Sequence, residues 1–159
     1  MSTRIRTSSP KGSNMKEFRC FVAGGRLTAI SQYISTIYSP VLVDLAPAIR
    51  QGLITYFANE LQQSLSKLYQ RYAVDIVLVN PRDSREEWKF MVIEANPFFE
   101  LTGEGLFESE EGRKIMNGED MDVEYPVMRV QTLKMVDGTE KELLTARRAV
   151  ESELSIIVT

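Results

Sequence analysis

The spacing of apolar side chains changes twice along the chain, from strand-like to helix-like and back. Two β-prone runs flank Gly24-Gly25, a pair that tolerates the positive φ of a tight two-residue turn, so we expect a hairpin over residues 17–33. From about residue 41 to residue 72, apolar side chains recur at spacings of three and four. This spacing predicts an amphipathic helix that begins near Asp44 or Pro47 and runs to Tyr72.

A second hairpin is predicted where two apolar runs, residues 73–79 and 88–94, flank a polar turn. Because these runs are apolar on both faces, we expect both strands to lie in the middle of a covered sheet. The remaining pattern predicts a loop over 101–107, a helix over 109–116, an acidic loop over 118–124, a strand over 125–133 and a helix over 140–153. The fold class expected is therefore α+β, a largely antiparallel sheet with flanking helices.

Composition fits one ordinary domain. The chain has 159 residues, 43% apolar and 26% charged, which suits a single globular core. Residues 1–15 are rich in Ser, Thr, Arg and Gly and contain little to bury, so we expect a disordered tail ahead of one domain over 16–159. We find no apolar run long enough to cross a membrane.

Charge and missing residue types exclude several kinds of chemistry. The net charge of −3 argues against a large surface that binds nucleic acid without sequence specificity, because such surfaces bind phosphates through an excess of Lys and Arg. The chain has no His, which excludes His-based triads and His metal ligands. Its single Cys, Cys20, excludes an internal disulfide and indicates a reducing, cytoplasmic location; we expect Cys20 to be a buried apolar residue.

Three oxygen-bearing side chains form the strongest candidate site. Glu94 and Asn96 are two residues apart on one strand, so their side chains point the same way. A register that pairs Asp75 with Glu94 also pairs Val79 with Phe90 and leaves a turn of ordinary length between the strands. Two opposed carboxylates are unfavourable unless one is protonated or a cation neutralises them, and such ligands suit Mg²⁺ or Mn²⁺. Alternatively, the acids lie at strand ends in solvent or pair with Lys and Arg.

Arg19 is a charged residue within an otherwise apolar strand. Its planar guanidinium suits a phosphate or a carboxylate, so the alternatives are a phosphate ligand and a salt bridge to Glu17 or Glu94. Simple alternation places Lys89 on the face opposite Glu94, away from this site. The sequence Gly103-Glu104-Gly105 does not follow a strand and open a helix, so we do not interpret it as a phosphate loop.

Two motifs in the same order and spacing resemble the C-terminal half of the cell division cycle protein 123 family. The first is Glu17-Phe18-Arg19-Cys20-Phe21-Val22 with its Gly turn and Leu27 to Tyr33. The second is Val92-Ile93-Glu94-Ala95-Asn96-Pro97-Phe98 with Thr102-Gly103 and Gly105-Leu106-Phe107. The resemblance covers about residues 16–107 and becomes loose beyond Glu108.

The resemblance implies the C-terminal lobe of an ATP-grasp fold, which holds Mg-ATP between two lobes. Asp75, Glu94 and Asn96 match the family's metal-binding acid, acid and amide, and Arg19 matches the strand Arg that faces the phosphates; the family usually has Asp where Glu94 stands. The expected cofactors are therefore ATP and Mg²⁺. We expect the adenine-binding N-terminal lobe to be absent.

Three functions are compatible with this interpretation. The first, which the resemblance implies, is a nucleotide-binding module that acts as an assembly chaperone for translation initiation factor 2 by binding its gamma subunit. Alternatively, the chain is half of an ATP-grasp carboxylate–amine ligase completed in trans or by a dimer, or a degenerate interaction scaffold without ligand. Whether ATP turns over, and on which acceptor, is left open. The face exposed by a missing lobe favours a protein partner or self-association in each case.

Overall fold

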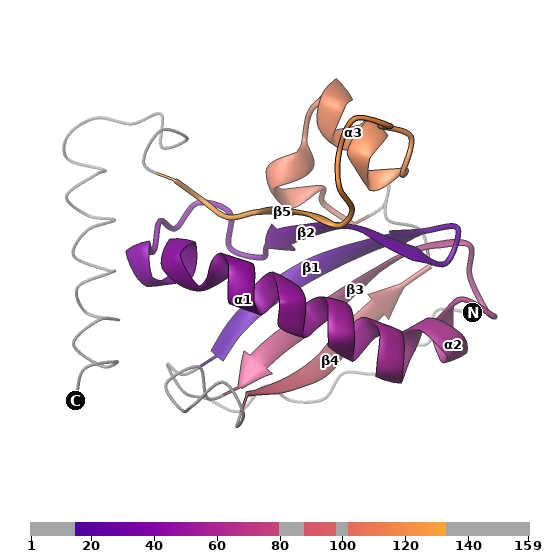
Figure 1. Cartoon of the computed structure of the whole chain (residues 1–159), viewed down its shortest axis with the longest axis horizontal. Helices are drawn as coiled ribbons and strands as arrows, with labels where there is room; N and C mark the ends of the chain where they lie inside the picture. Colours follow the sequence, from indigo (N-terminus) through magenta and orange to yellow (C-terminus); the bar gives the residue numbers. More distant parts are fainter. Residues whose placement is uncertain (1–14, 80–87, 98–101, 133–159) are drawn as a thin grey trace.

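The computed structural model describes residues 15–79, 88–97 and 102–132, and these form an α+β fold, as the sequence predicts. A five-stranded sheet has the strand order β4-β3-β1-β2-β5, and every adjacent pair is antiparallel except β2 with β5. Figure 1 shows helix α1 running across one face of this sheet, with α3 near the end formed by β2 and β5. No helix in these three ranges is long and apolar enough to cross a membrane.

The first predicted hairpin is confirmed. Strands β1 (Met15–Ala23) and β2 (Arg26–Gln32) pair across a turn in which Gly24 and Gly25 have φ of +59° and +74°. Both values lie in the left-handed region that glycine adopts without steric cost, which explains why this residue pair stands at the turn.

The long helix is confirmed in type but begins and ends earlier than predicted. Helix α1 (Pro40–Tyr56) begins after Ser39, whose Oγ accepts a hydrogen bond from the Leu42 N–H at 3.3 Å. It continues through a π-helical turn, η1 (Phe57–Leu61), into α2 (Gln62–Leu65). Pro40 at the first helical position and the Ser39 cap set the start, and Pro47 lies inside the helix instead of starting it.

Tyr72, predicted as the last helical position, belongs instead to strand β3 (Arg71–Val79). Its position fits both the spacing of apolar residues in the preceding helix and the alternation of apolar residues in the following strand. In the structure it begins a run of alternating core residues, Tyr72, Val74, Ile76 and Leu78, all buried against α1. Tyr72 therefore follows the alternation of the strand and not the repeat of the helix.

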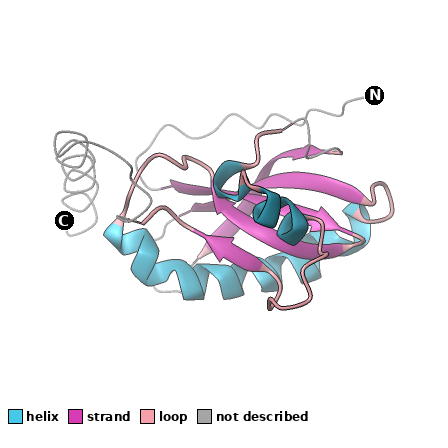
Figure 2. Ribbon diagram, turned by 90° about the horizontal axis from the view of Figure 1, so that it is seen from above, coloured by secondary structure: helices cyan, strands magenta, loops and turns pink. Residues whose placement is uncertain are grey.

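The sheet has two differently covered faces. The first face carries Phe18, Cys20, Ile30 and the alternating residues of β3, and packs against α1 through Leu42, Ile49 and Leu53. The second face is covered in part by the 3₁₀ turn η4 (Gly105–Phe107) and by α3 (Glu110–Met116). Figure 2, seen from above, shows α1 along one side of the sheet and the short helix separate from it.

The second predicted hairpin is confirmed, but only one of its strands is central. Strand β3 lies between β1 and β4, whereas β4 (Lys89–Asn96) is the terminal strand of the sheet in the part of the chain that is described. The expectation that both strands lie in the middle was therefore wrong for β4, whose Met91 is 46% exposed. Apolar side chains on both faces of β4 do not fix its position. Its residues Phe90 and Val92 pack into the core under α1, whereas Lys89 and Met91 on the other face are exposed.

The other elements agree with the sequence in order and differ in length. Helix α3 begins after Ser109, whose Oγ accepts the Gly112 N–H at 2.9 Å, as the predicted helix over 109–116 requires. The predicted loop over 101–107 ends in the turn η4. The strand predicted over 125–133 is reduced to β5 (Val127–Arg129). The predicted tail over 1–15 lies outside the described residues except for Met15, which belongs to strand β1 instead, and the predicted helix over 140–153 also lies outside them.

Candidate functional site

The register predicted for the two carboxylates is the register found. Asp75 on β3 pairs with Glu94 on β4, and Asn96 pairs with Ala73. Because Ala73 and Asp75 alternate onto the same face, both carboxylates and the Asn96 amide belong to the second face of the sheet. Asp75 is 2% exposed, whereas Glu94 and Asn96 are partly buried.

Between Asp75 and the turn, the predicted register was wrong by one residue. A β-bulge lies beside Asp75, since Asp75 pairs with Glu94 while Ile76 pairs with Val92. Val79 therefore pairs with Lys89 and not with Phe90. The extra residue in β4, Ile93, also reverses the alternation that follows, so Lys89 lies on the same face as Glu94 and not on the opposite face.

Arg19 forms a bidentate ion pair with Asp75. The two residues are directly paired across β1 and β3, and Arg19 Nε and Nη2 donate to Asp75 Oδ1 and Oδ2 at 2.8 and 2.9 Å. Their side chains are only 15% and 3% exposed. The salt-bridge alternative for Arg19 is thus realised with Asp75, not with Glu17 or Glu94. This pair neutralises the buried carboxylate without a metal ion.

The other side of the guanidinium contacts the segment that follows β4. Arg19 Nη1 donates to the carbonyl oxygens of Thr102 at 3.2 Å and Gly103 at 3.1 Å. The Tyr33 ring lies against it, with its centroid 5.0 Å from Arg19 Cζ. Arg19 therefore joins the centre of the sheet to a loop more than 80 residues away in the sequence.

Ser31 and Arg129 hold the next residues of that loop. The Leu106 N–H donates to Ser31 Oγ at 3.0 Å, and Arg129 Nη1 donates to the Leu106 carbonyl at 3.2 Å. Gly105 has a φ of +57°, and a Cβ atom there would lie 2.3 Å from Ser31 Oγ. The close approach requires glycine at this position. The Leu106 N–H is already bonded to Ser31, so it is not available to a phosphate.

Among the described residues, acidic groups outnumber basic groups at this part of the second face. Burial raises the pKa of Glu17, the Asp75 and Glu94 carboxylates raise it further, and Arg19 opposes them. Glu17 therefore lies in the field of two other acids with one guanidinium beside them. The excess negative charge favours a cation or a hydrogen-bond donor at this surface.

Asp75, Glu94 and Asn96 fit a magnesium ion by the chemistry of their donors. Mg²⁺ prefers oxygen ligands and takes one or two carboxylates, with waters and phosphate oxygens completing the shell. Each Asp75 oxygen accepts one hydrogen bond from Arg19 and has a second lone pair for another partner. Over the described ranges, no three Asp, Glu or Cys side chains gather closely enough to hold a metal ion, so a magnesium site here would need the Asn96 amide as well as the two carboxylates.

Sequence reasoning missed several residues that shape this surface, which are Ser31, Tyr33, Thr102 and Arg129. Thr102 takes part through its backbone carbonyl, which no side-chain pattern reveals. The sequence carries two signals for them. Ser31, Tyr33 and Thr102 lie within the motifs of the family resemblance, and glycine at 105, two residues after Gly103, indicates a tight turn.

Cys20 lies in the adjacent core and is predicted to be unreactive in the folded protein. It is fully buried on the first face, and burial, with a further contribution from Asp75, raises the pKa of its thiol. We expect a thiol reagent at mildly alkaline pH to label the chain only as fast as it unfolds, and completely in denaturant. Stoichiometric labelling of the folded protein on mixing, followed by absorbance, would contradict this burial; no other cysteine can contribute to the signal.

A family model described as D123 matches residues 11–153, which is most of the chain. No curated protein matches the chain. The matched range contains both hairpins, the Arg19–Asp75 pair and the Glu94–Asn96 strand. The chain therefore belongs to the D123 family, the cell division cycle protein 123 family.

Proposed function

We propose that this chain binds Mg²⁺-ATP at the second face of its sheet, as the C-terminal lobe of an ATP-grasp protein would. The observation that carries the proposal is the pairing of Asp75 with Glu94, with Asn96 on the same face and Arg19 bound to Asp75. Membership of the family supports the same interpretation, because the resemblance described above implies metal and phosphate roles for these positions.

Each residue has a distinct role in this proposal. Asp75, Glu94 and Asn96 would hold the Mg²⁺ ion, which when bound screens the charge of the phosphates. Arg19 fixes the Asp75 carboxylate in place and adds positive charge near the phosphates. Four of its five N–H donors serve Asp75, Thr102 and Gly103, so its first role is to position Asp75.

Calorimetric titration with Mg²⁺-ATP tests this site. We expect saturable binding to the wild-type chain and at least a tenfold weaker affinity, about 1.4 kcal/mol, for Asp75→Asn/Glu94→Gln. The single variant Glu94→Gln preserves the Arg19–Asp75 pair, so it reports on the ligand set without breaking the ion pair. A matched control is Asp122→Asn/Glu124→Gln, which removes the same charge from exposed positions between α3 and β5.

The control is expected to bind like the wild type. If the folded wild-type chain gives no heat at millimolar Mg²⁺-ATP, or if Glu94→Gln binds as well as wild type, the proposed nucleotide site is wrong. Thermal melting of each variant shows whether it is folded during the titration.

For the cellular role, we propose an assembly factor for translation initiation factor 2 that binds its gamma subunit. Family membership is the support for this role. Size-exclusion chromatography of the chain with purified gamma subunit is expected to show a complex. Separate elution at micromolar concentrations, with and without Mg²⁺-ATP, would contradict the proposed partner.

A further inference from the structure

One row of directly paired residues crosses all five strands on the second face of the sheet. In strand order from β5 to β4 the row consists of Arg129, Ser31, Arg19, Asp75 and Glu94. Directly paired residues project from the same face, so the row is a continuous line of polar side chains. Its acidic end is the proposed metal site, and its other three members bind the chain that follows β4.

Those three members hold residues 102–106, which we call the strap. Arg129 and Ser31 bind the carbonyl and the N–H of Leu106, and Arg19 Nη1 donates to the carbonyls of Thr102 and Gly103. The two bonds from Nη1 are 3.2 and 3.1 Å long, longer than the 2.8 and 2.9 Å bonds from Arg19 to Asp75. The strap therefore follows the row as far as the guanidinium that neutralises Asp75.

Arg19 has one N–H group left for a phosphate. A guanidinium carries one N–H on Nε and two on each Nη nitrogen. Asp75 takes the Nε group and one Nη2 group, and the two strap carbonyls take both Nη1 groups, which leaves the second Nη2 group without an acceptor among the described residues. A phosphate bound in bidentate fashion at the end of the guanidinium needs one N–H from Nη1 and one from Nη2. Such binding therefore requires that one strap carbonyl leave Nη1.

The exchange at Nη1 favours the phosphate. A hydrogen bond from a guanidinium to a charged oxygen is shorter and about twice as strong as a bond between neutral groups, and a peptide carbonyl is a neutral acceptor. Gly103 is exposed, so water can replace Arg19 as the donor to its carbonyl. The two bonds to Asp75 need not change, because they use the opposite edge of the guanidinium.

We propose that the strap and the phosphates of a bound nucleotide compete for Arg19 Nη1, so that nucleotide binding releases one strap carbonyl. The proposal rests on the Mg²⁺-ATP site proposed above. The coupling is reciprocal: a bound nucleotide loosens the strap, and a change that loosens the strap tightens nucleotide binding. Because the strap residue Glu104 is paired with Arg113 of α3, occupancy of the site is transmitted toward that helix.

The carbonyl ¹³C resonances of Thr102 and Gly103 report this exchange directly in the full chain. Loss of a charged hydrogen-bond donor moves a carbonyl carbon upfield. We expect one of the two resonances to move upfield on saturation with Mg²⁺-ATP, and also with Mg²⁺-tripolyphosphate, because the phosphates carry the effect. Mg²⁺ alone brings no competing acceptor and is expected to leave both resonances in place.

Gly105→Ala loosens the strap at a position that contacts neither Arg19 nor the proposed metal ligands. A Cβ atom at Gly105 would lie 2.3 Å from Ser31 Oγ, and its φ of +57° is strained for alanine. By calorimetry we expect this variant to bind Mg²⁺-ATP about threefold to tenfold more tightly, the contribution of one neutral hydrogen bond. Gly24→Ala is the matched control, because φ there is +59° but a Cβ atom would meet nothing within 4 Å, so its affinity is expected to equal that of the wild type.

The outcomes separate this inference from the proposed site. If Mg²⁺-ATP binds the wild type but neither carbonyl resonance moves, if Mg²⁺ alone moves one as far, or if folded Gly105→Ala binds no more tightly, the competition is wrong and the nucleotide site stands. No binding of Mg²⁺-ATP to the wild type overturns both. If thermal melting shows that Gly105→Ala does not fold, the two carbonyl resonances of the wild type decide alone.

Discussion

Replacing Arg19 by methionine is expected to cost about 3–5 kcal/mol of the free energy of unfolding, because it leaves the Asp75 carboxylate buried without its counter-charge. Asp75 is 2% exposed, and both its oxygens accept hydrogen bonds from Arg19. The same substitution removes the two bonds to the Thr102 and Gly103 carbonyls. Urea denaturation followed by circular dichroism measures the loss.

A double-mutant cycle gives the control for this prediction. Arg19→Met/Asp75→Leu removes both charges, so we expect it to be less destabilised than Arg19→Met alone, even though it carries one more substitution. Arg19→Lys keeps the positive charge but not the bidentate geometry, and an intermediate loss is expected. A loss below about 1 kcal/mol for Arg19→Met would mean that the pair is not a buried, coupled one.

Phe107→Ala is expected to have a destabilising effect of similar size, about 3–5 kcal/mol, since it removes a large, fully buried ring. The Phe107 ring contacts Phe21 edge-to-face, with centroids 6.2 Å apart, and its face lies 4.6 Å from Arg129 Cζ. Arg129 also holds the Leu106 carbonyl. The substitution therefore reaches the loop that contacts Arg19, as well as the core.

Two measurements test this prediction together. Thermal or urea unfolding gives the stability loss, and hydrogen exchange of the Leu106 amide, which donates to Ser31 Oγ, reports whether the loop loosens. Met121→Ala, at a residue 90% exposed between α3 and β5, is the control and is expected to change neither. Unchanged Leu106 protection in a destabilised Phe107→Ala would show that the ring supports the core and not the loop.

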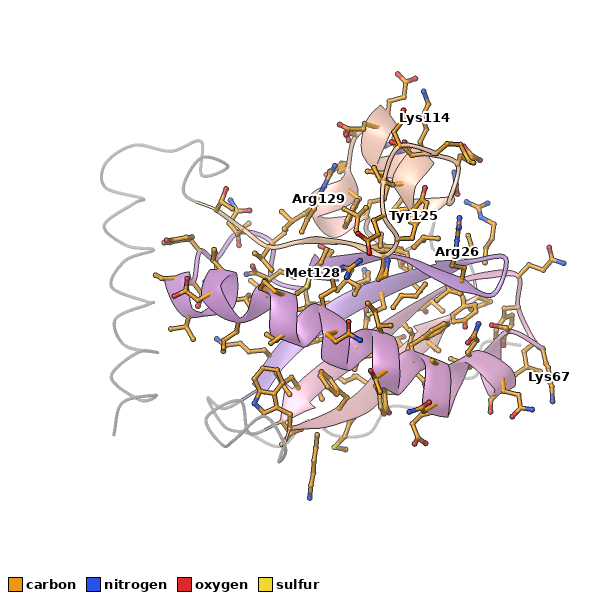
Figure 3. All side chains as sticks on the ribbon, in the orientation of Figure 1. Arg26, Lys67, Lys114, Tyr125, Met128 and Arg129 are labelled. Carbon is orange, nitrogen blue, oxygen red and sulfur yellow. The ribbon has the colours of Figure 1, made fainter. Side chains whose placement is uncertain are left out.

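Arginine side chains also attach the residues that follow α3 to the sheet. Figure 3 shows Arg26 and Tyr125 close together below α3, and Arg26 Cζ lies 4.3 Å from the Tyr125 ring centroid. Arg26 also donates to the Gly118 carbonyl at 3.0 Å. With Arg129 on Phe107, these contacts connect β2 and β5 to the residues around α3, so the second face is partly covered by stacked cations and rings.

Local signals in the sequence were sufficient for the type and order of most elements. The Gly24-Gly25 turn, the cap at Ser109 and the strand alternation in β3 depend on neighbouring residues alone, and the structure has each of them. The pairing of Asp75 with Glu94 also follows from turn length and alternation. These features are local because backbone conformation and hydrogen bonds within a hairpin are set over a few residues.

The boundaries of the helices and strands depend on tertiary contacts that the local sequence does not specify. The apolar spacing continues from the helix to Tyr72, yet the helix ends at Leu65, because Tyr72 fits equally well into a strand that pairs with β1. In the same way, β4 is apolar on both faces and still lies at the sheet edge. Both outcomes depend on which partner each segment packs against.

The features of the candidate site also fall into two groups, those that the local sequence sets and those that depend on tertiary contacts. The sequence by itself determined that Asp75, Glu94 and Asn96 share a face and that Cys20 is buried, since alternation along paired strands decides both. Only the tertiary structure decided that Arg19 pairs with Asp75, that a bulge turns Lys89 onto the Glu94 face, and that Thr102 and Gly103 reach Arg19. Non-local strand pairing creates these contacts, and a single inserted residue reverses every later side chain, so residue spacing alone does not encode them.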